Sequence, residues 1–408
     1  GLWYRRSGVQ DPSIAPFSLE KQKRQEGRHH LAVLESLSLF VIKLQLWDIK
    51  LLQLARNYSM SVMWDLPDFD DHEAVHFFHD IDTGLSAIVA LHSTHLGPGA
   101  GGTRFWHYEN RETAVTDALR LSRGMSFKNA MAGLPLGGGK AVILADRNRT
   151  KTPEILAAFG RMIDSLAGQY VTAEDVGMTA ADMVALTKET KYVSGLPVSN
   201  SGEAGGDPGP FTAMGVYLGV KAAVAHKLGR DNMDGVHVAI QGVGSVGGGL
   251  ARLLAKDGAK LSIADINKDH AAALAAEIGA TVVGLDEVMR IEADVFSPNA
   301  LGAILDKVSI AHLNVPIVAG GANNQLATPG DGQRIFDRNI LFAPDYVINS
   351  GGIISVGLEY LGDGDVKEVN RRVAMIPERL TEIWAQSASQ KLPDSDVADN
   401  MAMALIGR

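Results

Sequence analysis

Two lysines in glycine-rich surroundings are the residues of this 408-residue chain that most readily support chemistry. Lys128 opens the run Lys128-Asn129-Ala130, Lys140 ends the run 137–140, and a further glycine-rich stretch at 97–104 precedes both. The run 137–140 is not a phosphate loop, because it lacks the four-residue spacing and the Ser or Thr after the lysine. Burial and a like-charged neighbour lower the pKa of a lysine. We therefore expect one lysine to hold a carboxylate and the other to act as a base near neutral pH.

A carboxylate partner is available in the run 173–177, Ala-Glu-Asp-Val-Gly. The run reads as a strand-to-loop transition, a position from which a scaffold often presents functional groups. Either Glu174 or Asp175 fits the role of a proton carrier. On these residues alone, solvated lysines and a helix-capping aspartate are an equally good interpretation.

A second site is indicated by Gly242, Gly244 and Gly247, which give GxGxxG directly after a predicted strand and at the start of a predicted helix. This context favours a dinucleotide, whose pyrophosphate sits at the helix N-terminus. Asp265 ends the next predicted strand, 23 residues after Gly242, where a carboxylate binds the ribose hydroxyls and repels a 2′-phosphate. We predict NAD rather than NADP. The alternative is an ordinary glycine-rich turn with a surface aspartate.

The elements that position these residues follow from hydrophobic periodicity and turn signals. In the first half we expect short strands at Phe77–Phe78, Leu85–His92 and Ala141–Leu144. Helical spacing occurs at Ala114–Arg123, Pro153–Ala167 and Ala180–Thr190. After a Gly/Pro cluster at 202–210, strands at Val236–Gln241, Lys260–Asp265 and Asp294–Phe296 alternate with helices at Val246–Lys256 and His270–Ile278. Such alternation predicts an α/β fold with a doubly wound parallel sheet.

Composition narrows the class of protein. A net charge of −9 argues against nucleic acid or an anionic membrane as the main partner. The absence of cysteine excludes disulfides and thiol catalysis and fits a cytoplasmic location. Residues 1–60 hold nine basic and five acidic residues and only three of the 44 glycines, and their leucine-rich stretch is broken by charges, so we expect no membrane span. We interpret residues 1–59 as a non-native, disordered or helical extension.

Together the motifs resemble the leucine/phenylalanine/valine dehydrogenases of the glutamate dehydrogenase superfamily, from about residue 60 to about residue 385. The motifs that carry the resemblance are GGTR at 101–104, KNA at 128–130, GGGK at 137–140, AEDVG at 173–177, Asp207-Pro208 to Thr212-Ala213, 241–247, ANNQ at 322–325 and INSGG at 348–352. The resemblance implies a substrate-binding and assembly domain over 60–205, a Rossmann-type NAD-binding domain over 206–365, and a helical segment, 366–408, that crosses back. It also implies a homo-oligomer.

The resemblance further implies NAD-dependent reversible oxidative deamination of an L-amino acid to a 2-oxo acid and ammonium, with no metal. Lys128 would bind the α-carboxylate, with the Gly102 backbone and Asn324 completing the clamp. Lys140 would activate the attacking water and Asp175 would carry protons to and from the amino group. The implied cofactor contacts are Thr212, Gly242, Val243, Gly244, Ser245, Val246, Gly247, Asp265, Ile266, Ala300 and Asn323.

Substrate choice is expected at five positions that match the family's pocket and are all apolar: Ala100, Met125, Ala173, Ile353 and Val356. An unpaired side-chain carboxylate would be costly to bury there, so we expect neither glutamate nor aspartate. Ala173, Ile353 and Val356 resemble the residues of the branched-chain enzymes, which favours a branched-chain aliphatic substrate. Ala100 resembles phenylalanine dehydrogenases and leaves room for a larger side chain, so phenylalanine is the alternative.

A zinc hydrolase and a non-catalytic NAD-binding protein are the alternative classes of function. His72-Glu73-Ala74-Val75-His76 matches the HExxH signature of zinc hydrolases, but that signature needs a helix, and this stretch reads as part of a β-hairpin. A non-catalytic NAD-binding protein is the second alternative. It would bind NADH without turning over any amino acid.

Overall fold

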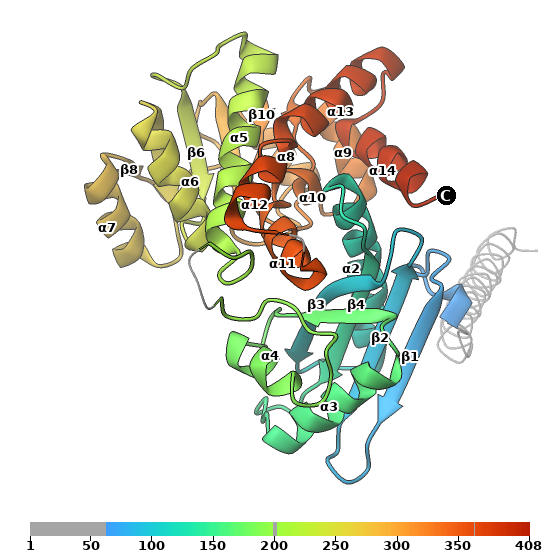
Figure 1. Cartoon of the computed structure of the whole chain (residues 1–408). Helices are drawn as coiled ribbons and strands as arrows, with labels where there is room; N and C mark the ends of the chain where they lie inside the picture. The colour runs from blue at the N-terminus through green and yellow to red at the C-terminus, as the bar shows by residue number, and fades with distance from the viewer. Residues whose placement is uncertain (1–62, 199–201, 363) are drawn as a thin grey trace, which may run out of the picture. The chain divides into compact units, whose positions relative to one another are not determined.

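The structure, a computed structural model, describes residues 63–198, 202–362 and 364–408. The predicted extension at 1–59 lies outside the described residues. Residues 63–66 belong to a separate unit and contain a short 3-10 helix, Met63–Asp65. The other unit, residues 67–408, contains two β-sheets (Figure 1).

The first sheet has five strands in the order β1-β2-β4-β3-β5. They are β1 (Ala74–His79), β2 (Ser86–Ser93), β3 (Gly99–Trp106), β4 (Gly137–Leu144) and β5 (Tyr170–Ala173). β1 and β2 form an antiparallel hairpin, and β2 also pairs antiparallel with β4, whereas β3 runs parallel to β4 and β5. Gly102 on β3 pairs with Ala173 on β5, so the residues that follow each of them lie at the same edge of the sheet.

Side-chain alternation assigns the two faces of this sheet to different helices. Ala141 and Ile143 on β4 join an apolar cluster with α3 (Pro153–Ser165) and α4 (Ala180–Leu186). Lys140 therefore faces the other side, toward α2 (Arg111–Met131). On that same side His92 of β2 bonds the Ser126 hydroxyl of α2 at 2.8 Å. The alternation thus directs Lys140 toward the helix that carries Lys128.

The second sheet has six strands, all parallel, in the order β11-β10-β9-β6-β7-β8. They are β6 (His237–Gln241), β7 (Lys260–Ala264), β8 (Thr281–Val282), β9 (Val295–Pro298), β10 (Ile317–Val318) and β11 (Leu341–Phe342). One face packs on α5 (Gly209–Leu228), α6 (Ser245–Lys256) and α7 (Lys268–Ile278). The other packs on α8 (Lys307–His312) and α9 (Pro329–Asp337). Strand order reverses between β6 and β9, the point at which sheets of this kind bind dinucleotides.

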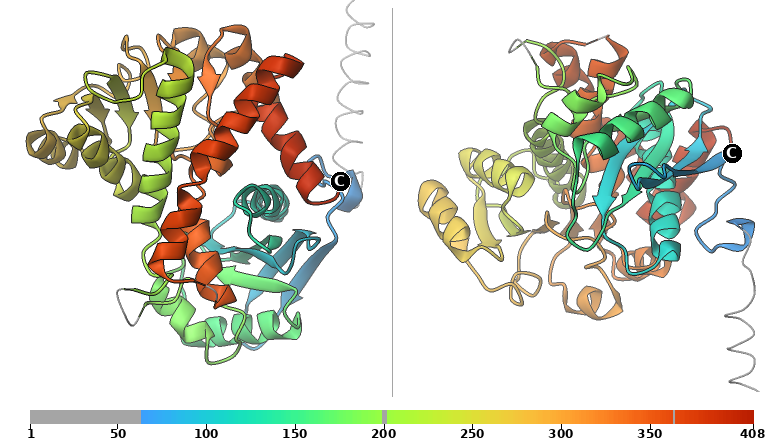
Figure 2. Two further views of the ribbon diagram at one scale, coloured as in Figure 1. Left: turned by 45° about the horizontal axis from the view of Figure 1, so that its top comes forward. Right: turned by 90° about the horizontal axis from the view of Figure 1, so that it is seen from below.

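Five helices complete the chain. They are α10 (Asp345–Ile348), α11 (Gly351–Leu361), α12 (Val366–Val373), α13 (Ile376–Gln390) and α14 (Asp394–Leu405). α11 and α13 pack on α5, and α14 contacts α2, as the left view of Figure 2 shows. Arg123 of α2 and Asp399 of α14 form an ion pair at 3.4 Å, and the Arg408 guanidinium donates to the Asp70 carbonyl at 2.8 Å.

The α/β class and the doubly wound sheet predicted from the sequence are confirmed. Three predicted details were wrong. The glycine-rich stretch at 97–104 was not assigned to a strand, yet most of it forms β3; α2 is longer than Ala114–Arg123 and includes Lys128; and α4 ends at Leu186 rather than Thr190.

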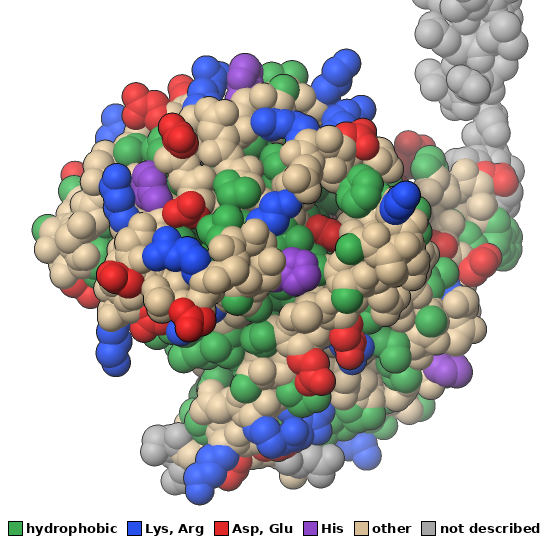
Figure 3. Space-filling model, turned by 90° about the horizontal axis from the view of Figure 1, so that it is seen from above, with side chains coloured by type: hydrophobic (Ala, Val, Ile, Leu, Met, Phe, Trp, Pro, Cys, Tyr) green, Lys and Arg blue, Asp and Glu red, His purple; other side chains and the backbone are tan. Residues whose placement is uncertain are grey.

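In Figure 3 basic and acidic side chains are interspersed over the face shown, without a broad patch of one sign. No helix among the described residues is long and apolar enough to cross a membrane.

Candidate active site

Lys140 is a buried lysine at the centre of the first sheet. It lies on β4 and is 5% exposed. Burial lowers its pKa; Asp175 opposes this effect, and the Arg104 guanidinium adds to it. Lys128 lies on α2 and is partly buried. Burial lowers its pKa to about 8, with Asp345 opposing and Lys140 adding to the decrease. Both lysines thus have the lowered pKa values that the sequence predicted for one of them.

Asp175, which follows β5, is the carboxylate that contacts Lys140. Its Oδ2 accepts from the Lys140 ammonium and lies 3.6 Å from the Arg104 Nε, and its Oδ1 accepts from the Val176 N–H at 2.6 Å. Burial alone raises the pKa of Asp175, but Lys140 and Arg104 outweigh burial, so the pKa lies below its usual value. Glu174 is the other residue that the sequence left open. It is exposed overall, and the partial burial of its carboxyl raises its pKa.

The glycines around these side chains permit the close approach of the chains that carry them. A Cβ on Gly101 would lie 1.9 Å from the Gly139 carbonyl oxygen, and one on Gly138 would lie 2.1 Å from the Ser126 nitrogen of α2. A Cβ on Gly102 would lie 2.9 Å from the Asp175 Cβ. Any side chain at these positions would push α2 or Asp175 away from Lys140.

A polar network connects Lys128 with the segment 323–349. The Lys128 Nζ lies 3.5 Å from the Asn323 Oδ1, which also accepts from the Asn349 side-chain amide at 2.8 Å. The Asn324 N–H donates to the carboxylate of Asp345, which stabilises Asn324 in a left-handed conformation with φ 51°. Asp345 was missed by sequence reasoning, because it lies in a short helix and belongs to none of the motifs that we singled out.

The GxGxxG segment has the geometry of a dinucleotide cradle. Gly242 has φ 84°, and a Cβ there would lie 2.6 Å from the Ala300 Cβ. A Cβ on Gly247 would lie 1.9 Å from the Gly242 carbonyl oxygen, whereas one on Gly244 would meet no atom of the described residues within 4 Å. Gly244 is also the N-cap of α6, and as a glycine it gives the N–H groups of the first turn no side-chain cap. These positions fit a pyrophosphate.

The remaining predicted cofactor residues surround this cradle. Asp265 follows β7 and accepts from the Val243 N–H at 2.8 Å, which fixes its carboxylate next to the glycine turn. Ile266 is 87% exposed beside it. Ser245 and Val246 form the first turn of α6. Thr212 lies in the first turn of α5, and its hydroxyl donates to the Pro208 carbonyl at 2.9 Å.

Comparisons with known proteins agree with this geometry. Residues 72–192 match the family described as Glu/Leu/Phe/Val dehydrogenase, dimerisation domain, and residues 262–406 match Glutamate/Leucine/Phenylalanine/Valine dehydrogenase. Leucine dehydrogenase from Geobacillus stearothermophilus is 45% identical over 81% of this chain and 90% of its own length. Valine dehydrogenase from Streptomyces albus is 43% identical over 82% of this chain and 92% of its own. The chain belongs to the Glu/Leu/Phe/Val dehydrogenase family. It is therefore an amino-acid dehydrogenase that uses a nicotinamide cofactor.

Solved structures show the same fold as this dehydrogenase. The crystal structure of L-tryptophan dehydrogenase from Nostoc punctiforme is 40% identical, covers 82% of this chain and 96% of its own, and superposes with a TM-score of 0.72. A hetero-hexameric glutamate dehydrogenase from Thermus thermophilus, at 20% identity and covering 89% and 95% of the two chains, has a TM-score of 0.65 and shares the fold alone.

The predicted specificity positions of this dehydrogenase fall on elements around the lysines. Ala100 on β3 is buried in an apolar cluster with Leu134 and Leu136, and Ile353 of α11 packs against the same cluster. Three further positions were predicted. Met125 faces Gly101, Ala173 ends β5 directly before Glu174 and Asp175, and Val356 is buried on α11. The structure thus brings Ala100 and Ile353 into one apolar wall, which joins residues from distant parts of the sequence.

The zinc alternative is not supported by the structure of this dehydrogenase. Residues 74–79 form strand β1 of the predicted hairpin, not the helix that the HExxH signature needs. The His72 Nε2 lies 3.0 Å from both the Leu119 carbonyl oxygen and the Ser122 hydroxyl, so this ring is engaged by α2. The described residues contain no group of three or more side chains placed to hold a metal ion.

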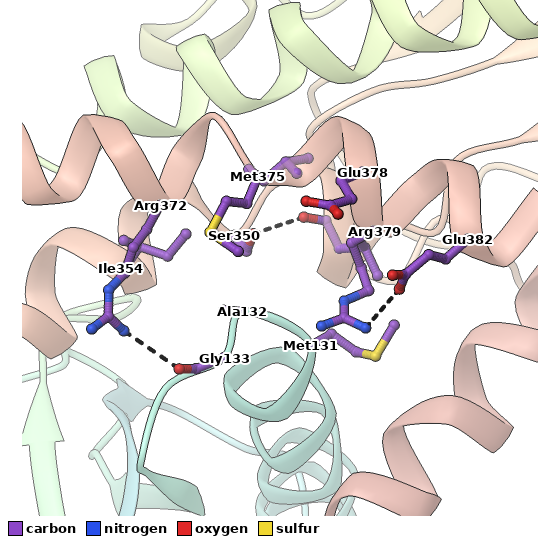
Figure 4. Close-up of a pocket in the computed structure, with 12 residues that line it drawn as sticks. Met131, Ala132, Gly133, Ser350, Ile354, Arg372, Met375, Glu378, Arg379 and Glu382 are labelled. Atoms are coloured by element: carbon purple, nitrogen blue, oxygen red, sulfur yellow. Dashed lines mark hydrogen bonds and ion pairs between the residues drawn. The ribbon is translucent and has the colours of Figure 1, made fainter.

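A separate cavity lies at the C-terminal end of α2 (Figure 4). Both of its arginines have partners: Arg379 pairs with Glu382 at 2.8 Å, and Arg372 donates to the Gly133 carbonyl at 3.4 Å. None of the predicted site residues lines this cavity. The cavity is therefore distinct from the Lys128–Lys140 region.

Proposed function

We propose that this dehydrogenase catalyses the reversible NAD-dependent oxidative deamination of a hydrophobic L-amino acid, with leucine, valine and isoleucine favoured. The products are the 2-oxo acid, ammonium and NADH. The observation that carries the proposal is the contact of Lys140 with Asp175 on the face of the sheet that α2 covers with Lys128. This arrangement supplies a base, a proton carrier and a cation for a carboxylate within one apolar, glycine-rich region.

The roles of the protein groups follow from their environments. Lys128, in its charged form, binds the substrate α-carboxylate, with the Gly102 backbone and Asn324 beside it. Lys140, in its neutral form, takes a proton from the water that attacks the imino carbon. The lowered pKa of Lys140 makes the neutral form accessible. Asp175, which is held on both oxygens, exchanges protons with the substrate amino group.

A bound nicotinamide would supply the hydride acceptor for the substrate Cα. The glycine turn at 242–247 would hold its pyrophosphate at the N-terminus of α6, and Asp265 would bind the ribose hydroxyls. A 2′-phosphate beside the Asp265 carboxylate is repelled, which supports NAD over NADP. Thr212, Ala300 and Asn323 contribute further contacts to the cofactor.

The hydrophobic substrate is supported by the five specificity positions, all of which are apolar. The names of the relatives, leucine and valine dehydrogenases at 43–45% identity, favour a branched-chain side chain. Ala100 favours the second candidate, an aromatic amino acid, because an alanine leaves more space than a larger apolar residue. The L-tryptophan dehydrogenase of Nostoc punctiforme, 42% identical, is a relative named for an aromatic substrate.

Assembly and location belong to the same proposal. The match of residues 72–192 to a dimerisation domain supports a homo-oligomer, and the absence of cysteine from the sequence supports a cytoplasmic location.

The test is a panel of L-amino acids assayed by NADH absorbance with NAD and, separately, NADP. We expect turnover with leucine, valine and isoleucine, weaker turnover with phenylalanine, and none with glutamate or aspartate. NADH binding without turnover of any amino acid would support the non-catalytic alternative instead.

A further inference from the structure

Arg104 on β3 is a second cation beside Asp175, in addition to Lys140. Arg104 follows Gly102 by two residues on β3, so both residues face the same side of the sheet, and Gly102 is the residue whose Cβ would touch Asp175. The Arg104 Nε lies 3.6 Å from the Asp175 Oδ2. This Nε–H is buried and has no hydrogen-bond partner among the described residues, and the Asp175 carboxylate beside it also binds Lys140.

The other end of the Arg104 guanidinium is fixed by Asp117 of α2. The Arg104 Nη1 lies 2.6 Å from the Asp117 Oδ2, and the Tyr108 hydroxyl donates to the same oxygen at 2.8 Å. The side chains of Arg104 and Asp117 are 23% and 14% exposed, so solvent screens this pair only partly. Asp117 thus restrains Arg104 and offsets part of its charge. The chain of contacts runs Tyr108, Asp117, Arg104, Asp175, Lys140.

The charges around Asp175 come from several elements. The groups that interact with it are Lys140 on β4, Arg104 on β3, Lys128 on α2 and Tyr170 on β5. Asp117 acts from α2 on both Arg104 and Lys140. Among these groups, Arg104 affects both members of the Lys140–Asp175 pair in the same direction, since its positive charge lowers the pKa of each.

We propose that Arg104, restrained by Asp117, is a positioning residue that keeps the Asp175 carboxylate ionised and oriented toward Lys140. The inference rests on the proposed function, because it assigns Arg104 a role only through those two groups. Arg104 does not touch the substrate in this account. Asp117 determines how strongly the Arg104 charge acts on Asp175 and Lys140. Removing Arg104 and removing Asp117 should therefore shift the pKa values of Asp175 and Lys140 in opposite directions.

The test compares the pH dependence of kcat/KM for L-leucine deamination in two purified full-length variants. In Arg104→Gln the lost cation raises the pKa of both Asp175 and Lys140, so the acid limb moves to higher pH. We expect kcat/KM to fall about tenfold at pH 7 and to recover at higher pH. In Asp117→Asn the guanidinium loses its counter-charge, so the limb moves to lower pH. Arg104→Lys, which keeps the charge, restores part of the wild-type profile.

A matched control is Arg120→Gln. Arg120 pairs with the other oxygen of Asp117, at 3.3 Å, and its side chain is 55% exposed. Like Arg104→Gln, Arg120→Gln removes one positive charge that pairs with Asp117, but Arg120 does not face Asp175. We therefore expect this variant to keep the wild-type pH profile. Thermal unfolding of each variant reports loss of folding separately, because a structural defect lowers kcat/KM at all pH values without moving the limb.

Three results would overturn the proposal: an unchanged limb in Arg104→Gln, shifts of the same sign in Arg104→Gln and Asp117→Asn, or a uniform loss of activity that Arg104→Lys does not restore. Failure of the proposed function is distinguishable. If Lys140→Met retains turnover, the roles of Lys140 and Asp175 are wrong, whereas an inactive Lys140→Met with a wild-type profile in Arg104→Gln rejects only the role of Arg104.

Discussion

Lys140 and Asp175 form a hydrogen-bonded ion pair although their strands, β4 and β5, are separated by β3. The glycines of β3 make this possible, since the backbone at Gly101 and Gly102 leaves the space that side chains would fill. A base and a carboxylate thus meet across a strand that contributes mainly backbone. In the proposed function, this contact brings together the two groups that transfer protons.

Lys128 is expected to act in substrate binding more than in chemistry. Lys128→Gln keeps an amide donor but loses the charge that attracts the α-carboxylate. We expect KM for L-leucine to rise by about 10- to 100-fold, the loss typical of a hydrogen bond to a charged group, with little change in KM for NAD. Lys191→Gln removes an exposed lysine from the same domain and should leave both constants unchanged. An equal rise in KM for NAD would contradict the assignment.

The glycines of the cofactor turn are expected to differ in what they do. Gly247→Ala places a Cβ 1.9 Å from the Gly242 carbonyl oxygen, so it should lower the free energy of unfolding by about 1–3 kcal/mol. Gly244→Ala meets no neighbour and should unfold at nearly the wild-type temperature while raising KM for NAD. Thermal unfolding and steady-state kinetics measure the two effects. Wild-type KM for NAD in Gly244→Ala would show that the pyrophosphate does not bind there.

Asp265 is expected to set the preference for NAD. Asp265→Ser retains an oxygen acceptor for the Val243 N–H but removes the negative charge that repels a 2′-phosphate. The ratio of kcat/KM for NAD to that for NADP should fall by about tenfold or more, equivalent to about 1.4 kcal/mol. Asp269→Ser, an exposed aspartate in the first turn of α7, is the control. A ratio that stays constant in Asp265→Ser would exclude this role.

Ala100 is expected to control the size of the accepted side chain. Ala100→Leu adds volume to the wall that contains Leu134, Leu136 and Ile353. Activity with phenylalanine should fall about 10- to 200-fold relative to activity with valine, the range typical of a misfit in an apolar pocket. Thermal unfolding separates this effect from overpacking. An equal loss of activity with both substrates in a stable variant would show that Ala100 does not line the substrate pocket.

The sequence predicted β6, β7 and β9 of the second sheet and the helices α6 and α7, because these segments have a clear hydrophobic pattern. It missed β8, β10 and β11, because strands of two residues are too short to show such a pattern. It missed β3 because three of its eight residues are glycine, which has a low strand propensity. These glycines are required by close approaches that only the fold reveals, such as that of Gly101 to the Gly139 carbonyl.

The length of α2 was underestimated for a related reason. Its C-terminal turns are buried on several sides and include the polar residues Ser126 and Asn129, so the apolar spacing of an amphipathic helix is absent. The residues of the candidate site could be identified from sequence motifs. The contacts between these residues could not be predicted in this way. That Asp175 rather than Glu174 contacts Lys140, and that Asp345 stabilises Asn324, depend on pairings between distant segments.

The most direct measurement of the central claim is turnover of L-leucine with NAD by Lys140→Met beside the wild-type enzyme, with NADH binding followed by fluorescence. Methionine fills the buried space of Lys140 but cannot accept a proton. We predict that the wild-type enzyme forms NADH, with a rate that rises with pH as Lys140 loses its proton. In the variant we predict a loss of about 1000-fold with NADH affinity nearly unchanged. Turnover within a few-fold of wild type in the variant would contradict the account.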